Sequence, residues 1–517
     1  MLTIVKRIRE VRMQFDEQFF YITICLWSFF VLFFTLPASY IFNRIRDLRT
    51  WFIFITRSAH STHRRRVAFI QRQMKKWNNN GRKTKLCTSR RGWKTLGVCL
   101  PKYKDGCTLI NISGLQDILE INLQQEYVHV EPMLNIGQLI KYLVPNGYTL
   151  PIVPELEDLT VGGLINGFGV GSSSKKYGFF HELCLSFELV LSDGSLVTTA
   201  KTEGVEKDFA LFYGVPFSHG SIGVLVSAKL KIIPCKPFVK LTYVPCNSLE
   251  LSACFLCAED RSNEFVEGIH FSQDFGVVVK GCFSDGPARN ERISTIGKWY
   301  QPLFFEHVSN VGVLEGYTEH VPVVRYYCRH SKSFFWEIKN ILPFVRSDFF
   351  RFFLGWMLPP RITMLKDSVT HQIENYHRKI NVICSFLQFF PKMLFVAYLL
   401  WLLTVSQIYP LWLCPLVLNP TPGFMRQRAG KRLLFCCIGM SGTLRKSDVV
   451  IPNALKKIEA YLSSISGFKM AFGDCYMDKP QFWEMFNSNL YHWLRVKYDC
   501  QDAFPDVYDK ICYAAYS

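Results

Sequence analysis

The sequence predicts an α+β fold of several domains that begins with a membrane helix. Its 517 residues are enough for about three domains. Hydrophobic residues make up 49% of the chain and charged residues 20%, a balance typical of globular proteins that excludes a disordered chain. An uncharged stretch lies near the N-terminus, and from residue 108 onward short strand patterns alternate with helical ones.

The uncharged stretch predicts a transmembrane anchor. Residues 18–43 carry no formal charge, and a helix of that length spans roughly 39 Å, against a hydrocarbon core of about 30 Å. A cleaved signal peptide would have a shorter apolar core and a small-residue cleavage site. We therefore expect a short N-terminal segment at residues 1–18 and a retained anchor at residues 19–43.

Residues 44–85 predict a basic juxtamembrane connector that is helical from about residue 64. They hold 13 Lys and Arg residues against one acid, Asp47, so most of the net charge of +18 lies beside the anchor. By the positive-inside rule this places the C-terminal bulk in the cytosol, and it favours anionic lipid rather than nucleic acid as the partner. His60 and His63 lie in this stretch, and we expect both to face solvent.

The body of the chain reads as short strands with helices between them. Residues 108–112 predict a strand, and residues 118–122 and 127–132 predict a strand pair. Apolar residues at helical spacing predict a helix over residues 135–143. Strands at residues 185–191 and 195–199 are joined by a turn at 192–194, and a turn and strand over 220–234 close the region.

A glycine-rich segment at residues 151–178 is the most informative part of the sequence. Glycine recurs at positions 162, 163, 167, 169 and 171, although glycine forfeits side-chain burial and costs backbone entropy. That cost is offset where main-chain N–H groups approach an anionic ligand such as a pyrophosphate. The alternative is that these glycines serve only turns and tight strand packing. The G-x-G-x-G spacing, without a βαβ unit, argues against a Rossmann fingerprint, and the sequence contains no P-loop motif.

Several runs of residues carry a family resemblance. Residues 160–165 (TVGGLI), 171–178 (GSSSKKYG) and 192–194 (SDG) resemble the FAD-binding domain of the vanillyl-alcohol-oxidase type. Within that superfamily the chain is similar to the delta(24)-sterol reductase, or 24-dehydrocholesterol reductase, family. This closer similarity is carried by residues 151–163 (PIVPELEDLTVGG), 353–360 (FLGWMLPP), 409–415 (YPLWLCP), 481–486 (QFWEMF) and 500–512 (CQDAFPDVYDKIC).

The resemblance implies a domain organisation and an activity. It implies a two-subdomain FAD-binding domain at residues 60–235, an α+β substrate or cap domain at residues 236–475, and a C-terminal segment at residues 476–517 that packs on the FAD domain. The implied enzyme is an FAD-dependent oxidoreductase of sterol and cholesterol biosynthesis that reduces the C24=C25 side-chain bond with NADPH. An enzyme acid would protonate the bond, and the reduced flavin N5 would supply the hydride. The family also implies a single-pass protein of the endoplasmic reticulum membrane whose catalytic domain faces the cytosol.

The resemblance also implies which residues bind FAD. No histidine is well placed for a covalent link to the flavin, so we expect the FAD to be non-covalent. Tyr177 has an equally simple alternative role in packing. The predicted cofactor-binding residues are Thr160, Val161, Gly162, Gly163, Leu164, Ile165, Asn166, Gly167, Phe168, Gly169, Val170, Gly171, Ser172, Tyr177, Gly178, Gly220, Ser221 and Gly223.

The candidate catalytic residues lie in the run YYCRH at residues 326–330, which matches a family Tyr-Tyr-His-Arg-His stretch. A histidine titrates near neutral pH, so His330 is the candidate acid and Arg329 the candidate clamp for an anion or the cofactor. The alternative is that both residues are satisfied in a hydrogen-bond network between the domains.

The sequence departs from the family at three places. Cys328 stands where the family usually has histidine, and Cys437 and Ser441 hold the places of an acid and a tyrosine. Residues 386–405 are apolar with Lys392 as their only charge, and we expect them to be buried or to dip into the membrane rather than to cross it.

Two other functions remain open on the sequence alone. One is an FAD-dependent oxidase or dehydrogenase acting on a sugar lactone or alcohol, and the other is a catalytically weak sterol-binding membrane protein, which the departures motivate. We expect no metal site, because Cys254 and Cys257 form a lone C-x-x-C pair with no second pair and no histidine nearby.

Overall fold

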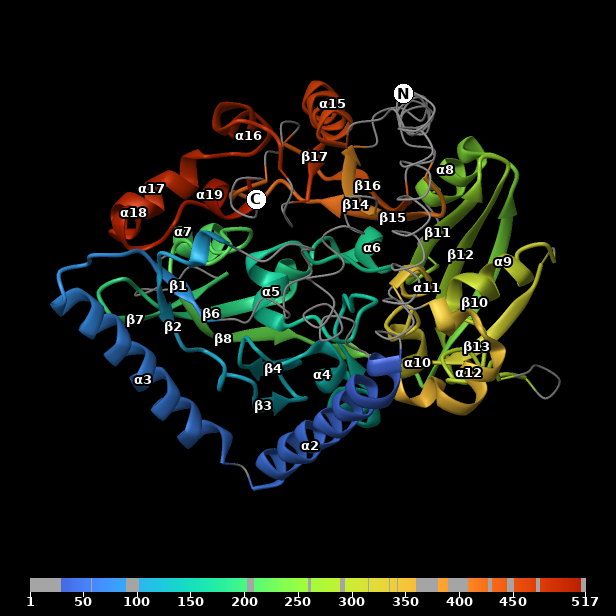
Figure 1. The fold of residues 1–517 in the computed structure, drawn as a ribbon, viewed down its shortest axis with the longest axis horizontal. Helices are drawn as coiled ribbons and strands as arrows, with labels where there is room; N and C mark the ends of the chain where they lie inside the picture. Colours follow the sequence, from blue (N-terminus) through green and yellow to red (C-terminus); the bar gives the residue numbers. More distant parts are fainter. Residues whose placement is uncertain are drawn as a thin grey trace, which may run out of the picture.

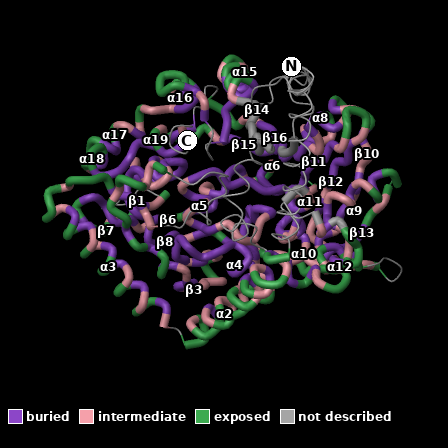
Figure 2. Tube along the Cα trace, viewed as in Figure 1, coloured by how far each residue is buried: buried purple, intermediate pink, exposed green. Residues whose placement is uncertain are grey.

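Two antiparallel sheets make up most of the molecule, and Figure 1 shows them lying side by side. The computed structural model describes residues 29–56, 58–89, 102–201, 209–258, 262–288, 293–314, 316–333, 335–341, 343–358, 380–388, 408–425, 430–443, 451–470 and 475–512. Figure 2 shows buried residues running along both sheets, so each sheet has its own share of the core. The α+β prediction is confirmed.

The N-terminal helices continue beyond the predicted anchor. A π-helical turn at Val31–Thr35 leads into α2 (Leu36–Ile55), and α3 (Ala59–Asn79) follows. Of the helices in the described ranges, none combines the length and the apolar character needed to cross a membrane. Residues 19–28 of the predicted anchor lie outside the described residues. The transmembrane prediction is therefore not confirmed.

The basic stretch is indeed helical, but α3 is a packed helix as well as a connector. One face of it buries Val67, Ile70, Met74 and Trp77, which lie three or four residues apart. His63 falls on the same face and is buried, with its Nδ1 2.8 Å from Glu131 Oε1. The prediction that His63 faces solvent is therefore wrong. The helical spacing of the apolar residues decides which face of α3 is buried, and His63 lies on that face despite the charged residues around it.

The first sheet holds the strands predicted around the glycine-rich segment. Its order is β3 (Ile118–Asn122), β4 (Tyr127–Val130), β8 (Val224–Lys231), β6 (Cys184–Val190) and β7 (Leu196–Ala200). The β6–β7 turn has Gly194 at φ +86°, as the predicted hairpin needs. The predicted helix is α4 (Ile136–Leu143). Two small pairs lie beside this sheet: β1 (Leu86–Thr88) with β2 (Thr108–Ile110), in parallel, and β5 (Tyr148–Thr149) with β9 (Ile233–Pro234).

The second sheet has eight strands. Their order is β13 (Thr318–Pro322), β10 (Phe238–Cys246), β12 (Phe275–Ser284), β11 (Phe265–Ser272), β15 (Leu411–Leu418), β16 (Leu433–Thr443), β14 (Ile380–Gln388) and β17 (Phe468–Lys469). The predicted membrane contact at residues 386–405 therefore begins in β14, and its residues 389–405 lie outside the described ranges.

Short helices connect and flank the sheets. The first region holds α5 (Val161–Asn166), α6 (Ser174–Tyr177) and α7 (Phe209–Gly214). The second holds α8 (Leu249–Cys257), α9 (Phe304–Val311), α10 (Val323–Tyr327), α11 (Ile338–Ile341), α12 (Asp348–Leu354) and α15 (Ile451–Ser464).

The C-terminal helices return to the first sheet region. They are α16 (Lys479–Met485), α17 (Asn489–Lys497), α18 (Cys500–Ala503) and α19 (Val507–Ile511), and Figure 1 shows them beside α7 and β1. Arg495 Nη1 donates to the Ser221 carbonyl at 2.6 Å, and Lys510 Nζ donates to the His219 carbonyl at 3.0 Å. The tail thus supports the loop that precedes β8, while the domain boundaries at residues 60, 235 and 475 stay predictions.

Candidate functional site

The glycine-rich segment lies between the two sheets and starts with a capped helix. The Thr160 hydroxyl accepts a hydrogen bond from the Gly163 N–H at 3.3 Å, which fixes the first turn of α5. The Gly162 N–H donates to the Pro132 carbonyl at 2.7 Å, and a Cβ on Gly162 would lie 2.6 Å from Pro132 Cβ. Glycine is therefore required here for the close approach of α5 to the end of β4.

The apolar side chains of the segment point into the core. Those of Val161, Leu164, Ile165, Phe168 and Val170 are buried. Gly162, Gly163 and Asn166 are only half-buried, so α5 has one open face. The segment can therefore offer a ligand its backbone and small side chains, while its large apolar residues hold the backbone in place.

The two predicted cofactor segments lie together. The His219 N–H donates to the Asn166 carbonyl at 2.9 Å, and the Gly220 N–H donates to Asn166 Oδ1 at 3.1 Å. Gly220 has a φ of +68°, a conformation that favours glycine. Residues 54 positions apart in the sequence thus form one continuous surface beside α5.

Ser221 has two partners that leave little room for another. Its hydroxyl donates to the Ser218 carbonyl at 2.5 Å and lies 2.8 Å from the Tyr491 hydroxyl. Tyr491 comes from α17 in the C-terminal tail, and its hydroxyl also accepts from the Val507 N–H. Sequence reasoning missed Tyr491, since no local pattern distinguishes it from other aromatic residues of the tail.

The turn at Gly171 and Ser172 joins the first region to the eight-stranded sheet. The Ser172 N–H donates to Glu155 Oε1 at 2.6 Å, and the Val266 N–H donates to the Ser172 carbonyl at 2.8 Å. The Ser172 hydroxyl lies 3.0 Å from the Tyr326 hydroxyl. A Cβ on Gly171 would lie 2.6 Å from the Val153 carbonyl oxygen, so this position also requires glycine.

Arg329 connects two carboxylates from different regions. Its Nε donates to Glu267 Oε1 at 2.8 Å, and its Nη2 donates to Glu155 Oε1 at 3.3 Å. All three side chains are buried. Burial raises the pKa of Glu155 to about 7, although the charge of Arg329 opposes this rise. Burial alone would also raise the pKa of Glu267, but the charges of Arg329 and His330 hold it below its ordinary value.

His330 is enclosed by the same cluster. Its Nε2 lies 3.3 Å from Glu267 Oε2, which also accepts from Trp412 Nε1 at 2.8 Å. The rings of Phe335 and Phe304 lie 4.3 and 4.9 Å from the imidazole, and its Nδ1 has no hydrogen-bond partner among the residues that the structure describes. Burial lowers the pKa of His330. The structure therefore brings His330 and Arg329 together beside the Gly171 turn, within a network between the two regions, and the acid role of His330 stays a prediction.

Tyr177 lies at the edge of the site. Its hydroxyl donates to Glu264 Oε2 at 3.3 Å, and Lys176 Nζ lies 5.2 Å from the centre of its ring. Gly178 has a φ of +83°, and a Cβ there would lie 2.5 Å from Glu182 Oε1. Gly223 is restricted similarly, since its Cβ would lie 3.2 Å from the Val190 carbonyl oxygen.

Two of the departures from the family, Cys328 and Cys437, lie beside this network. Cys328 Sγ lies 3.7 Å from Glu157 Oε2, and burial raises its pKa. Cys437 is buried on β16 opposite Cys414, whose thiol donates to the Gly171 carbonyl at 3.2 Å. Ser441 lies on β16 opposite Val382. Within the described parts of the chain, no three His, Cys, Asp or Glu side chains are grouped as metal ligands.

The residues fit a flavin dinucleotide on two structural grounds. The open face of α5 presents backbone groups, and a second loop with a left-handed glycine lies alongside. Gly162, Gly171 and Gly178 instead permit close packing against Pro132, Val153 and Glu182. The carboxylates Glu155 and Glu267 were not predicted. Glu155 lies within the quoted PIVPELEDL run, where Glu157 and Asp158 stand beside it, so no local signal distinguishes it.

Comparisons with known proteins support an FAD-binding domain and cover more than nine tenths of the chain. Residues 77–200 match a family model described as an FAD binding domain. The chain is 41% identical over 490 residues to the delta(24)-sterol reductase of Homo sapiens, covering 94% of this chain and 93% of that one. It is 40% identical over 494 residues to a delta(24)-sterol reductase homolog of Caenorhabditis elegans (93% and 94%) and 31% identical over 517 residues to the delta(24)-sterol reductase of Pisum sativum (93% and 90%). Together with the glycine-lined surface beside α5, these matches show that the chain belongs to the delta(24)-sterol reductase family.

Proposed function

We propose that the protein is an FAD-dependent oxidoreductase that reduces the C24=C25 bond of a sterol side chain with NADPH. The observation that carries this proposal is the surface formed by Asn166, His219 and Gly220 within a chain that matches the reductases over more than nine tenths of its length. FAD bound on this surface would supply hydride transfer between the nicotinamide and the alkene. NADPH is the donor that the family resemblance implies.

The residues of the chain have distinct roles in this proposal. The open face of α5 and the loop at Gly220 bind the cofactor through backbone groups. Arg329 holds the two regions together through Glu155 and Glu267. His330 donates the proton that an isolated alkene requires, and its lowered pKa makes the protonated imidazole a stronger acid than an exposed one.

A turnover assay tests the proposal. The purified protein, loaded with FAD, is incubated with NADPH and a sterol that has a C24=C25 bond, and the products are identified by mass spectrometry. We expect the saturated side chain in amounts that depend on NADPH. Peroxide formation from an alditol or a lactone without sterol turnover would instead identify the oxidase. Sterol binding without reduction would identify a sterol-binding protein.

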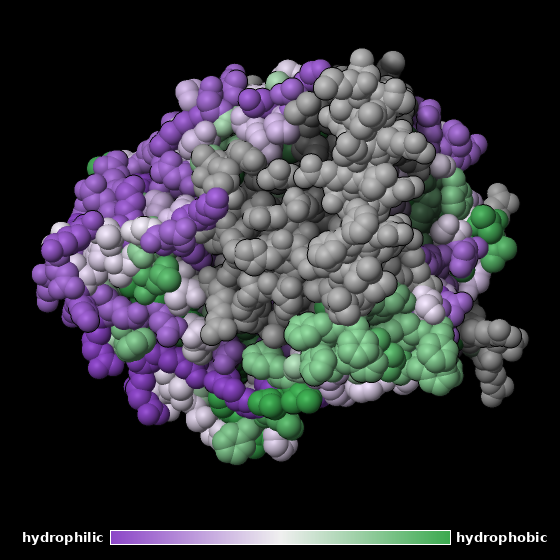
Figure 3. All heavy atoms as spheres, viewed as in Figure 1, coloured by the Kyte–Doolittle hydropathy of each residue, from purple (hydrophilic) through white to green (hydrophobic). Residues whose placement is uncertain are grey.

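We also propose that α2 and α12 form the membrane-contacting surface, called the α2–α12 face below. The Phe, Ile, Leu and Trp side chains that define it are between 42% and 70% exposed, and Figure 3 shows hydrophobic residues gathered over these two helices. So large an exposed apolar patch is unusual on a soluble surface. The residues of the face are Phe33, Phe42, Ile45, Leu48, Phe52, Phe349, Phe352, Phe353 and Trp356.

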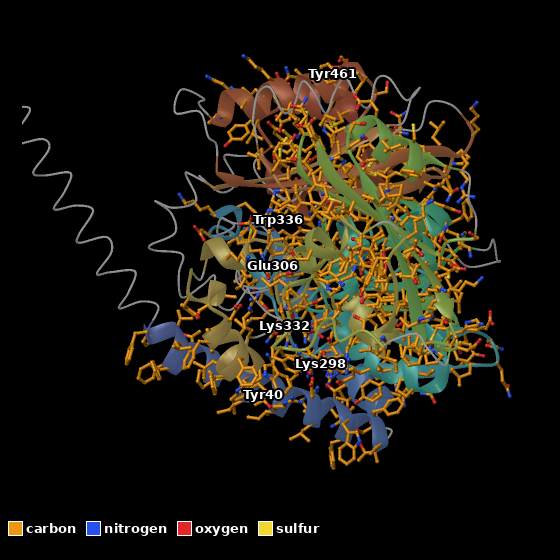
Figure 4. All side chains as sticks on the ribbon, turned by 90° about the vertical axis from the view of Figure 1, so that its right-hand side faces the viewer. Tyr40, Lys298, Glu306, Lys332, Trp336 and Tyr461 are labelled. Atoms are coloured by element: carbon orange, nitrogen blue, oxygen red, sulfur yellow. The ribbon has the colours of Figure 1, made fainter. Side chains whose placement is uncertain are left out.

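The α2–α12 face is a fixed part of the fold, and the helix that follows α2 in the chain is basic. Val31 and Leu36 are buried against Phe350 and Met357, and the rings of Tyr40 and Trp356 lie 5.0 Å apart. Figure 4 shows Tyr40 below the part of the chain that carries Glu306, Lys332 and Trp336. The next helix, α3, has an exposed row of cations that suits anionic headgroups: Arg64, Arg65, Arg72, Lys75 and Lys76.

A site-specific probe tests this surface in the full-length protein. An environment-sensitive fluorescent amino acid replaces Phe353 or, as a matched control, Trp493, which is 50% exposed on α17. In proteoliposomes we expect brominated lipid to quench the probe at position 353 and to leave the probe at position 493 unquenched. Equal quenching at the two positions would refute the assignment.

The location in the cell is a further part of the proposal. The basic stretch after residue 43 and the family resemblance support a single-pass protein of the endoplasmic reticulum membrane with its catalytic domain in the cytosol. Protease added to intact microsomes should degrade the FAD domain. Protection of that domain until detergent is added would contradict the orientation.

A further inference from the structure

The loop between α7 and β8 has an unusual backbone. Residues 217–223 of this loop, called the cofactor loop below, lie outside any helix or strand. Phe217 has a φ of +63°, His219 of +51° and Gly220 of +68°. Left-handed conformations cost free energy in residues other than glycine, and they persist only where surrounding contacts impose them. The cofactor loop therefore depends on other parts of the chain to hold its shape.

Lys510 binds two successive carbonyl groups of the cofactor loop. Its Nζ donates to the His219 carbonyl at 3.0 Å and to the Gly220 carbonyl at 3.2 Å. Lys510 lies on α19 and is only 5% exposed, so these carbonyls replace much of the water that its ammonium group would otherwise bind. The lysine and the two carbonyls thus satisfy each other inside the protein.

Two further residues of the C-terminal tail bind the next two carbonyl groups. The Ser221 carbonyl accepts from Arg495 Nη1 at 2.6 Å, and the Ile222 carbonyl accepts from the Cys500 thiol at 2.9 Å. Arg495 is buried and also donates to the Phe504 carbonyl at 2.8 Å, so it joins the loop to the tail's own backbone. Four successive carbonyls of the cofactor loop therefore face one segment that lies more than 270 positions further along the chain.

The other side of the cofactor loop faces α5. The N–H and C=O of a trans peptide point in opposite directions, so a peptide whose carbonyl faces the tail directs its N–H away from the tail. The Gly220 N–H shares a peptide with the His219 carbonyl, and it donates to Asn166 Oδ1 at 3.1 Å. Lys510 is therefore one peptide unit away from the surface formed by Asn166, His219 and Gly220.

We propose that the C-terminal tail is part of the cofactor site, with Lys510 and Arg495 as positioning residues that hold the cofactor loop in its FAD-binding shape. Both residues act through the backbone of the loop and not by contact with FAD. The inference rests on the proposed function in one respect, namely that FAD lies on the surface beside α5. Because coupling between two sites is reciprocal, bound FAD must stabilise the tail as much as the tail favours FAD.

Titration of the full-length protein, freed of flavin, with FAD tests the proposal. Lys510→Met removes the cation and keeps an apolar side chain of similar length. We expect the dissociation constant for FAD, measured by flavin fluorescence, to rise about tenfold or more, as when hydrogen bonds from a charged donor are lost. Lys479→Met is the matched control, because Lys479 is an exposed lysine of α16 in the same tail. Equal affinities of the two variants would overturn the proposal.

A conservative pair of variants separates positioning from packing. Arg495→Lys keeps a cation that can donate to the Ser221 carbonyl, whereas Arg495→Met does not. We expect the lysine variant to bind FAD more tightly than the methionine variant. Equal losses of affinity in the two variants would show that Arg495 only fills space, and that result would refute its positioning role.

Hydrogen–deuterium exchange of the unaltered protein tests the same coupling without any variant. Added FAD should slow amide exchange severalfold in α17 and α19 and leave exchange in α8, beside the eight-stranded sheet, unchanged. Unchanged exchange in the tail helices would contradict the proposal. NADPH and sterol are absent from all these measurements. FAD binding that depends on Lys510 but is followed by no sterol turnover would therefore refute the reductase proposal alone, and FAD binding that ignores Lys510 would refute this inference alone.

Discussion

Arg329 Nε lies 2.8 Å from Glu267 Oε1, and neither side chain is more than 1% exposed. Glu267 is on β11 of the eight-stranded sheet, while the second partner of Arg329, Glu155, precedes the glycine-rich segment. One guanidinium therefore holds the sheet region against the turn at Ser172, whose N–H is bound to Glu155. The turn at Ser172 and the eight-stranded sheet thus depend on the same buried ion pair.

Replacing Arg329 tests this relationship. Arg329→Met leaves two buried carboxylates without a cation, and we expect a loss of about 3–5 kcal/mol in the free energy of unfolding, with loss of FAD. Chemical denaturation and the flavin absorbance measure the two effects. Arg325→Met, on α10 four residues before Arg329, is the control, with an expected change of about 0.5 kcal/mol or less. Equal effects of the two variants would contradict the assignment.

Gly163 tests the cofactor surface. It is half-buried on the open face of α5, so Gly163→Trp should block the approach of FAD and leave a folded protein without flavin. Gly163→Ala adds a single methyl group and should retain measurable FAD. Flavin content is read from the absorbance spectrum and folding from circular dichroism. A normal flavin spectrum in folded Gly163→Trp would remove this segment from the site.

His330→Gln separates proton donation from binding. The flavin should still be bleached by NADPH at the normal rate, because that step needs no proton from His330. Reoxidation by sterol should slow by about 10²–10⁴-fold, the usual contribution of a general acid. His307→Gln, which alters another histidine–glutamate pair in the same region, is the control. Unchanged reoxidation would leave His330 with a positioning role only.

His63 predicts a pH-dependent stability. Burial alone would lower its pKa, but the hydrogen bond to Glu131 and the Glu188 carboxylate, 3.7 Å from Nε2, raise it from 6.5 to about 9. Because the folded pKa is the higher one, the stabilisation is fully present below about pH 6.5 and is lost as the pH rises through 9. His63→Gln should therefore cost about 1.5–3 kcal/mol at pH 6 and almost nothing above pH 10, as measured by urea denaturation. A loss that does not change with pH would indicate packing alone.

Local patterns predicted much of the fold. The alternation of apolar and polar residues was enough to predict the β3–β4 strand pair, and the turn at Gly194 was enough to predict the β6–β7 hairpin. Both features are determined by residues that are close together in the sequence. The N-terminus was harder. A hydropathy pattern does not distinguish residues that pack against the protein, as Val31 and Leu36 do, from residues that face lipid.

The site was predictable only where its residues are contiguous. The glycines beside α5 and the neighbouring Arg329 and His330 stand out in the sequence. Glu155 lies 174 positions from Arg329, and Tyr491 lies 270 positions from Ser221, so only the tertiary fold brings these polar partners together. The burial of His63 was missed for the related reason that its partner Glu131 lies on a different element.

Anaerobic stopped-flow spectroscopy of the detergent-purified protein tests the central claim most directly. NADPH is added first to bleach the bound flavin, and a sterol with a C24=C25 bond is added next. The reductase account predicts bleaching, then reoxidation by the sterol with recovery of the saturated side chain. Bleaching that the sterol does not reverse, or a folded protein that holds no flavin, would contradict it.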